Sequence, residues 1–480
     1  MFMILFSLAV ILSLSKVIMA ATVSLPETGQ NQCYDSGGNV IGCSGTGQDG
    51  DWKAGVTIAG QRFTPGAGAQ SECVTDNLTG LMWVKSPDGT ARTWQQGLNY
   101  VKGLNLCEYT DWRMPSIVEL ESLVNDGYNE QSCSGSPCGT NAAWLNKQAI
   151  SNVQSGGYWS GTTRACDTGY AWYINMYDGL LDFNFKNSTY YIWPVRGGGG
   201  ATASPWQTGQ KNCYDATGTS ISCTGTGQDG DIHPGVAWPV PRFTINGTTG
   251  TVTDNLTGLI WLKNANCFGS QTWANALSAA NTLASGACGL NDGSAAGDWR
   301  LPNRKEMLSL VDFAYCSPAL SNAEGTGQGT AGDPFDSVPS NIYWSATTYA
   351  DGTNYAWDVN MGGGFVHNYS KTSSHSLWPV RGGHIDHLAT CPNSLIKIGT
   401  QPFTTIEDAY GAAGDHDVIR LQAVYFSPAG SDLTITDNKT VTLQGGYNCN
   451  YSNQIGNSTV SADVLIGGAG TVIVDRVSIE

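Results

Sequence analysis

One domain-sized block of this sequence is written twice in tandem, and no other feature constrains the fold as strongly. Corresponding motifs follow one another in the same order in both copies: VTDNLTGL from Val74 and Val252, DWR from Asp111 and Asp298, YWS from Tyr158 and Tyr343, YAW from Tyr170 and Tyr355, and WPVRGG from Trp193 and Trp378. Solenoid repeats are only about 20–50 residues long. A longer unit is a complete domain, so the sequence predicts two copies of one fold.

The edges of the copies divide the chain into five parts. Residues 29–198 form the first predicted domain and residues 209–383 the second, because TGQxxCYD opens both copies and WPVRGG closes both. The small residues that dominate 199–208 predict a flexible linker. An apolar segment, 1–21, precedes the first copy, and a tail, 391–480, differs in kind from both.

Each copy has the pattern of an α+β domain. In the second copy the apolar spacing of TWANALSAANTLA predicts an amphipathic helix, and LPNRKEMLSLVDF predicts another, with Pro302 in its first turn. Short strands are expected on both sides of the NLTG turn and in YWSATTY, NYAWDVNM and SLWPVRG, with a hairpin turn at 362–365. Because strands follow the helices instead of alternating with them, we expect α+β and not α/β.

The N-terminal segment is typical of a secretory signal peptide, with an apolar run followed by small residues at Ala20 and Ala21. No Lys or Arg precedes that run, so an N-terminal anchor helix is the alternative. Lys16 cuts the run short of the roughly 20 residues that a span needs. We therefore expect a secreted, periplasmic or cell-surface protein of a bacterium, with no transmembrane span after signal removal.

Fourteen cysteines in an exported chain predict disulfides. Identical spacing in the two copies favours the pairs Cys33–Cys43 and Cys213–Cys223. Two further pairs are expected, Cys267–Cys288 in the second copy and Cys391–Cys449 in the tail. The spacing leaves the others unassigned: Cys73, Cys107, Cys133, Cys138, Cys166 and Cys316.

The net charge of −16 disfavours nucleic acid as a partner, because an acidic surface repels phosphates. An acidic surface can attract cations, and GTGQDGD, present in both copies, places two carboxylates around a glycine. Such oxygen ligands suit Ca²⁺, although the rest of a calcium loop is missing and a plain turn beside the disulfide is the alternative. The candidate ligands are Asp49, Asp51, Asp229 and Asp231. His384 and His387 could share a metal, and no other cofactor is expected.

The recurring Trp, Arg and Pro residues have a structural interpretation. In DWRxP we expect the Trp in the core, the Arg paired with Glu119 or Glu306 or with a backbone carbonyl, and the Pro at a helix start; the Arg of WPVRGG is also expected to be structural. These residues are Trp112, Arg113, Pro115, Trp299, Arg300, Pro302, Arg196 and Arg381. Four other tryptophans could stack on the apolar face of a sugar, although core aromatics are commoner: Trp159, Trp344, Trp172 and Trp357.

The ordered set WxxA, DWRxPxxxE, YWSxTT, YAW and WPVRGG resembles the Lcl C-terminal domain family, which closes a bacterial collagen-like adhesin. The resemblance implies an extracellular module, associated in that adhesin with binding sulfated glycosaminoglycans and with self-assembly. This chain departs from the adhesin because it has no collagen-like tract and few basic residues. More remotely, the motif order resembles the C-type-lectin-like and sulfatase-modifying fold. The tail resembles the opening of a right-handed parallel β-helix, a β-solenoid fragment.

Three functions remain open. We favour an exported, non-enzymatic binding or adhesion protein whose two lectin-like modules recognise an extracellular glycan or surface polymer. The alternatives are a polysaccharide-acting enzyme, or its carbohydrate-binding portion, and a structural envelope component without a ligand. No catalytic residue is expected, because GxSxG, HExxH and phosphate-loop motifs are missing from the sequence. An oligomer remains an option.

Overall fold

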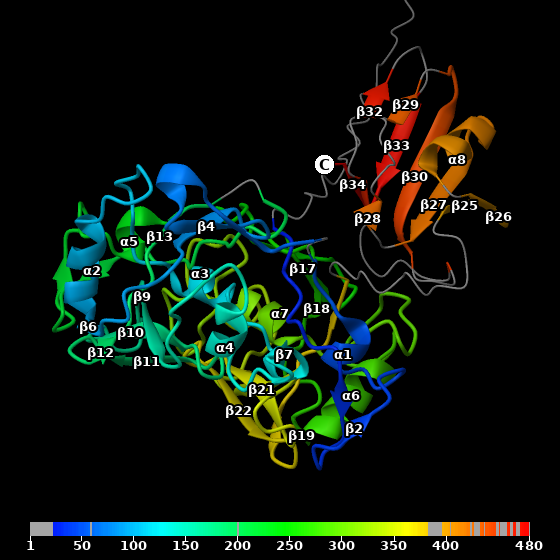
Figure 1. The fold of residues 1–480 in the computed structure, drawn as a ribbon. Helices are drawn as coiled ribbons and strands as arrows, with labels where there is room; N and C mark the ends of the chain where they lie inside the picture. Colours follow the sequence, from blue (N-terminus) through cyan, green and yellow to red (C-terminus); the bar gives the residue numbers. More distant parts are fainter. Residues whose placement is uncertain are drawn as a thin grey trace, which may run out of the picture.

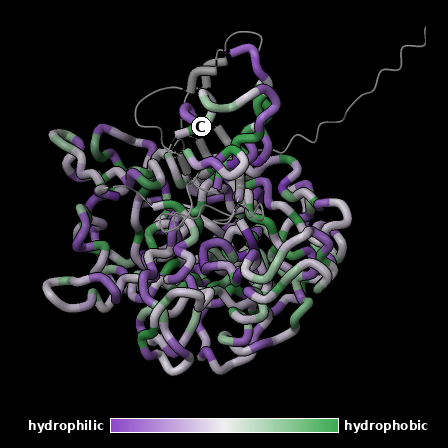
Figure 2. The backbone as a smooth tube through the Cα atoms, turned by 90° about the vertical axis from the view of Figure 1, so that its right-hand side faces the viewer, coloured by the Kyte–Doolittle hydropathy of each residue, from purple (hydrophilic) through white to green (hydrophobic). Residues whose placement is uncertain are grey.

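The computed structural model describes residues 23–57, 60–198 and 201–382, and in the tail residues 396–403, 405–422, 425–426, 433–435, 437–447, 451, 458–460, 464–466 and 471–479. The predicted signal segment, the pair Cys391–Cys449, and His384 and His387 lie outside these residues. Among the described residues, no helix is both long and apolar enough to cross a membrane. In Figure 2 hydrophilic and hydrophobic residues alternate over short stretches of the tube.

Both copies combine short helices with several small sheets, which confirms the α+β class (Figure 1). The first copy contains β1 (Cys33–Tyr34), β2 (Val40–Ile41), α1 (Asp49–Trp52), β3 (Phe63–Pro65), β4 (Cys73–Asp76), β5 (Leu81–Val84), β6 (Arg92–Thr93), α2 (Trp94–Lys102), α3 (Ile117–Glu121), β7 (Ser132–Cys133), β8 (Ser136–Pro137), α4 (Asn141–Asn146), β9 (Gly157–Thr163), β10 (Tyr170–Asn175), β11 (Leu181–Phe185), β12 (Thr189–Tyr190) and β13 (Val195–Gly197).

The second copy repeats most of these elements in the same order, and the strands predicted around its NLTG turn are β17 and β18. It contains β14 (Cys213–Tyr214), β15 (Ser220–Ile221), α5 (Asp229–Ile232), β16 (Phe243–Ile245), β17 (Thr251–Asp254), β18 (Ile260–Leu262), β19 (Ser270–Thr272), α6 (Trp273–Thr282), α7 (Arg304–Ser309), β20 (Ile342–Thr348), β21 (Tyr355–Asn360), β22 (Val366–Ser370), β23 (Ser374–Ser376) and β24 (Val380–Arg381).

One eight-stranded sheet runs through both copies, in the order β19-β23-β20-β21-β22-β11-β10-β9. The copies meet in the antiparallel pair β11–β22, where Leu181 lies opposite Val366. These two residues occupy the same position in their copies, since the offset of 185 residues that separates Trp193 from Trp378 also separates Leu181 from Val366. An approximate two-fold axis therefore passes through this pair, as at the interface of a symmetric dimer.

Capping boxes start the helices that follow the DWRxP motifs. Ser116 accepts a hydrogen bond from the backbone N–H of Glu119 in α3, and Asn303 accepts one from that of Glu306 in α7, while each Glu side chain binds back to the cap. The expectation that Pro302 lies in the first turn is wrong. Asn303 supplies the capping oxygen, so the helix begins at Arg304 and Pro302 precedes the cap.

The aromatic core continues from one copy into the other. Trp83 packs edge-on against Trp193 with ring centroids 5.5 Å apart, and Trp261 against Trp378 at 5.6 Å. One cluster of buried hydrophobic residues includes all four rings together with side chains from both copies. The copies therefore share a core instead of forming two independent ones.

The predicted flexible linker is packed against this core over its second half. Ala203 and Trp206 are buried, and the backbone N–H of Ala203 donates to the carbonyl of Leu78 at 2.9 Å. The small residues suggested a free chain, but the indole of Trp206 is apolar enough to be drawn into the core.

The tail has three sheets whose strands pair largely in parallel, β27–β30–β33, β28–β31–β34 and β29–β32. Its elements are β25 (Ile396–Ile398), β26 (Gln401–Phe403), α8 (Ile406–Ala412), β27 (Val418–Gln422), β28 (Tyr425–Phe426), β29 (Leu433–Ile435), β30 (Thr440–Tyr447), β31 (Ser458–Val460), β32 (Val464–Ile466), β33 (Thr471–Asp475) and β34 (Val477–Ile479). The right-handed β-helix and the C-type-lectin-like fold stay predictions.

Candidate functional site

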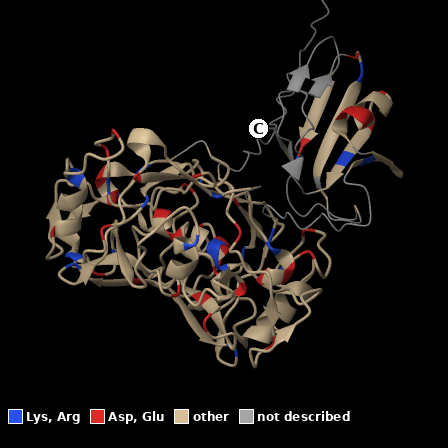
Figure 3. Ribbon diagram, in the orientation of Figure 1, with Lys and Arg blue, Asp and Glu red and all other residues tan. Residues whose placement is uncertain are grey.

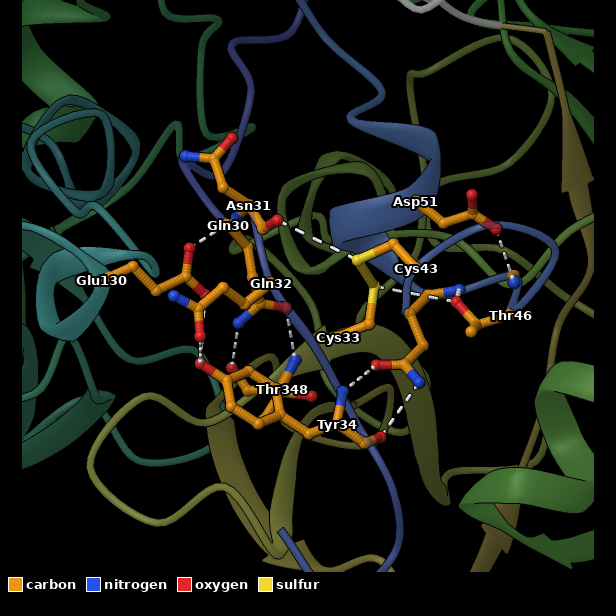
Figure 4. The surroundings of a disulfide bond; sticks show 12 residues. Gln30, Asn31, Gln32, Cys33, Tyr34, Cys43, Thr46, Asp51, Glu130 and Thr348 are labelled. Atoms are coloured by element: carbon orange, nitrogen blue, oxygen red, sulfur yellow. Dashed lines mark hydrogen bonds between the residues drawn. A yellow bond between two sulfur atoms is a disulfide. The ribbon is translucent and has the colours of Figure 1, made fainter. Parts of the chain in front are cut away.

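Each disulfide-closed loop docks on the body of the other copy. The Gln30 side chain donates to the Thr348 carbonyl at 2.7 Å and accepts from the Thr348 N–H at 2.8 Å (Figure 4). In the other half Gln210 makes the same pair of bonds with Thr163. The loop at the start of the first copy thus packs on the second copy, and the loop at the start of the second copy packs on the first.

The first loop also contacts its own copy, so it lies between the two bodies. Cys33–Cys43 closes the β1–β2 hairpin, and the Gln48 side chain clamps the backbone of Tyr34 with bonds of 2.9 and 3.0 Å (Figure 4). Glu130 of the first copy accepts from the Asn31 N–H at 2.5 Å. The loop is therefore held from both sides.

Asp49 lies buried at the centre of the exchanged contact. Its Oδ2 accepts from the hydroxyls of Thr28, at 2.7 Å, and Thr347 of the second copy, at 2.6 Å. Burial raises the pKa of this carboxyl to about 7, against the opposing effect of the two hydroxyls. Two neutral donors do not replace the hydration of a charge, so a proton is held unusually well here.

Asp229 repeats this arrangement in the other half. Its Oδ2 accepts from Thr208 at 2.7 Å and from Thr162 of the first copy at 2.6 Å. Burial raises its pKa to about 6. A carboxyl group that holds the other copy thus stands at the same position in both loops.

The two carboxylates of each GTGQDGD loop bind different partners. Asp51 accepts from the backbone N–H of Gly47 at 3.0 Å, and Asp231 from that of Gly227 at 2.9 Å, so both brace their own turns. Over the described part of the chain, no three His, Cys, Asp or Glu side chains are grouped to hold a metal. The contacts give these aspartates roles in the turn and in docking, and Ca²⁺ binding stays a prediction.

Two buried lysines, which the sequence did not single out, complete the docking sites. Lys186 lies 4.1 Å from the ring centroid of Trp94 and donates to the Asp215 carbonyl of the other copy's loop at 3.1 Å. Lys371 repeats this over the ring of Trp273, at 4.0 Å. Desolvation lowers the pKa of both lysines to about 7. The signal in the sequence was a Lys-x-Ser at matching positions in the two copies.

A buried ion cluster joins the copies near the approximate two-fold axis. Arg304 of α7 donates to Asp126 at 2.8 Å and to Glu121 of α3 at 2.9 Å, and all three side chains are almost fully buried. Lys305 donates to the carbonyl of Val124 at 3.0 Å. In Figure 3, which has the orientation of Figure 1, α7 carries basic residues and α3 carries acidic ones. The cluster is asymmetric, because the second copy supplies the cations and the first the carboxylates.

The DWRxP residues form a matched structural unit. Arg113 makes a two-pronged ion pair with Glu119 and Arg300 with Glu306, with closest contacts of 2.6 and 2.5 Å. Trp112 and Trp299 are buried. Of the two WPVRGG arginines, Arg196 pairs with Asp111 at 2.7 Å and Arg381 with Asp292 at 3.2 Å. Pro115 and Pro302 both precede the capping residue of the next helix.

Five disulfides are present in the described part of the chain. The predicted pairs Cys33–Cys43, Cys213–Cys223 and Cys267–Cys288 are confirmed. Two more form from cysteines that the spacing left unassigned, Cys73–Cys107 and Cys133–Cys138. So many bridges favour an oxidising compartment outside the cytoplasm.

The tryptophans considered as sugar platforms are core residues. Trp159 and Trp344 are 0% exposed, and Trp172 and Trp357 are 1% exposed. A sugar can stack only on an accessible ring face, so this burial argues against all four.

An exposed aromatic patch of the first copy, which the sequence did not single out, offers such a face. Tyr170 and Phe185 lie opposite each other on β10 and β11, with ring centroids 4.1 Å apart. Phe185 is 56% exposed. Beside them the Arg164 guanidinium lies 3.7 Å from the ring centroid of Phe183. We call Arg164, Tyr170, Phe183 and Phe185 the aromatic patch.

The second copy does not repeat the aromatic patch. Its β21 and β22 pair in the same register, but Ser370 stands where Phe185 does and Asn368 where Phe183 does. The periodicity of β11 was ambiguous, because alternating aromatics suit a buried face as well as an exposed one.

Comparison with known proteins places the chain in a family. The Lcl C-terminal domain matches residues 72–196 and 250–381, one segment in each copy and together more than half of the chain. No curated protein matches it. The matched segments hold the DWRxP motifs and the shared sheet, whereas the exchanged loops at 28–57 and 208–236 lie outside them. Membership suggests a surface or adhesin-type protein. The chain belongs to the Lcl C-terminal domain family.

Proposed function

We propose that this is an exported, non-enzymatic binding protein that attaches to extracellular glycans or surface polymers. Family membership and the five disulfides support a surface role. The observation that carries the binding function is the aromatic patch of the first copy, in which an exposed ring lies beside a second ring and a guanidinium.

The chemistry of the patch suits a sugar ring. The apolar C–H face of a sugar can lie on Phe185 and Tyr170, as apolar groups do on exposed aromatic faces. The guanidinium of Arg164 supplies several N–H donors for hydroxyl oxygens. The net charge of −16 opposes approach of a sulfated polyanion, so uncharged glycans are the expected class.

The test is a glycan array with the purified mature protein, followed by calorimetric titration of the best ligands. Ser is the residue at the equivalent position of the second copy. Phe185→Ser should weaken binding about tenfold, because it removes roughly 1.4 kcal/mol of stacking on the sugar. Tyr355→Ser is the matched control, because Tyr355 is also exposed but lies opposite Ser370, with no aromatic partner across the strands. It should bind like the wild type.

Other outcomes separate the alternatives. Binding unaffected by Phe185→Ser would refute the patch as the site. Silence toward every glycan, with and without Ca²⁺, would favour a structural envelope component. Release of sugar from a polymer would favour a polysaccharide-acting enzyme.

A further inference from the structure

Two thiols from different copies face each other across the shared interface. Cys166 follows β9 in the first copy, and Cys316 follows α7 in the second; these are the cysteines that carry free thiols in the described part of the chain. The Cys166 and Cys316 thiols are close enough to interact with each other. Cys166 is exposed and Cys316 is partly so, so a small reagent can reach the pair.

One side chain, Gln210, ties together the two segments that lead to the cysteines. Thr163 and Phe313, each three residues before one of the cysteines, both accept a hydrogen bond from the Gln210 side chain through their carbonyls. The Phe313 ring also packs on Trp172 of the first copy, with centroids 5.4 Å apart. The contact between the thiols therefore depends on packed core residues.

In the symmetry-related half of the molecule, the segments equivalent to those of Cys316 and Cys166 also lie in contact. The position of Cys316 corresponds to Asn129 of the first copy, and the residue before Cys166 corresponds to Ala350 of the second. In that half the Asn129 side chain donates to the Ala350 carbonyl at 2.9 Å. The two segments thus approach each other in both halves.

We infer that Cys166 and Cys316 form a disulfide that joins the two copies covalently. A disulfide-bearing oxidant of the compartment outside the cytoplasm, or glutathione disulfide, accepts the two electrons. One thiol, as its thiolate, attacks the oxidant's disulfide and releases one reduced thiol; the second thiolate then displaces the other. The S–S bond forms with loss of two protons and two electrons from the pair, and one molecule of glutathione disulfide becomes two of glutathione.

The disulfides seen in the structure make this inference testable, because each of them links cysteines of one copy. A site for a specific protease is inserted between residues 200 and 201 of the full chain. The protein is purified from a bacterial periplasm, incubated with glutathione disulfide, cleaved, and run on a denaturing gel without reductant. We expect one band of uncut mass, which separates into two fragments on addition of dithiothreitol.

Cys316→Ser and Cys166→Ser are the controls, and each should separate into two fragments without reductant. Peptide mapping of the wild type should find residues 166 and 316 in one linked peptide. The inference is overturned if the wild-type fragments separate without reductant, if they stay linked in Cys316→Ser, or if mapping finds either cysteine alkylated.

Discussion

Replacing Arg304 with Ile tests whether the buried ion cluster holds the copies together. Ile is the residue at the equivalent position of the first copy, Ile117, so the side chain suits a helix start of this kind. The change leaves Glu121 and Asp126 buried without the guanidinium that serves both. Removing one partner of a buried ion pair costs about 3–5 kcal/mol, and two carboxylates place this variant near the upper end.

The loss should depend on pH in a defined direction. Burial already raises the pKa of Glu121 to about 7 with Arg304 present, and removing the cation raises it further. A raised carboxyl pKa favours folding at low pH, and this contribution is lost as the pH rises through the folded-state value. The deficit of Arg304→Ile against wild type should therefore be smaller at pH 6 than at pH 8.5.

The triple variant Arg304→Ile, Glu121→Leu, Asp126→Phe is the matched control. It installs the residues at the equivalent positions of the other half, Ile117, Leu308 and Phe313, which are all buried in the shared core. An apolar replacement of a whole buried ion group is often neutral or stabilising, so most of the loss should be recovered. Urea unfolding followed by tryptophan fluorescence gives the free energies. A single variant within about 1 kcal/mol of wild type, or a triple variant no better than the single, would refute the reasoning.

Two other predictions concern the exchanged loops. Burial raises the pKa of Asp49 from 3.8 to about 7, so the contribution of this carboxyl to stability is lost as the pH rises from about 4 to 7. Asn does not titrate, so the free energy of unfolding of Asp49→Asn, measured with urea, should rise by about 4 kcal/mol relative to wild type over that range. Parallel curves of stability against pH would contradict this. Lys371→Met removes the hydrogen bond to the Asp35 carbonyl and should increase hydrogen exchange of the first copy's loop, 33–43. Lys186→Met removes the bond to the Asp215 carbonyl and should do the same for the loop 213–223. Each increase should be about tenfold, the effect of about 1.4 kcal/mol; an effect on the loop of the same copy would argue against the exchange.

Local features were predictable where neighbours along the chain decide them. The NLTG strands, the helix at 273–282 and the Cys33–Cys43 bridge all follow from periodicity or short spacing. The Pro302 expectation failed because a proline before a helix fits either side of the cap, and only the Asn303 bond showed which side applies. The aromatic patch was not predicted, because the alternating pattern of a strand does not show which of its two faces is exposed to solvent.

The sequence by itself determined that one α+β unit occurs twice, that several helices and strands recur in it, and that Cys33–Cys43, Cys213–Cys223 and Cys267–Cys288 are paired. Only the tertiary structure decided that the loops are exchanged, that one sheet crosses both copies at Leu181 and Val366, and that Cys166 meets Cys316. The reason is physical. The copies carry the same local patterns, so either copy offers each loop a Thr hydroxyl and a Lys over a Trp ring. The choice between them rests on contacts between residues far apart in the chain, which no local pattern records.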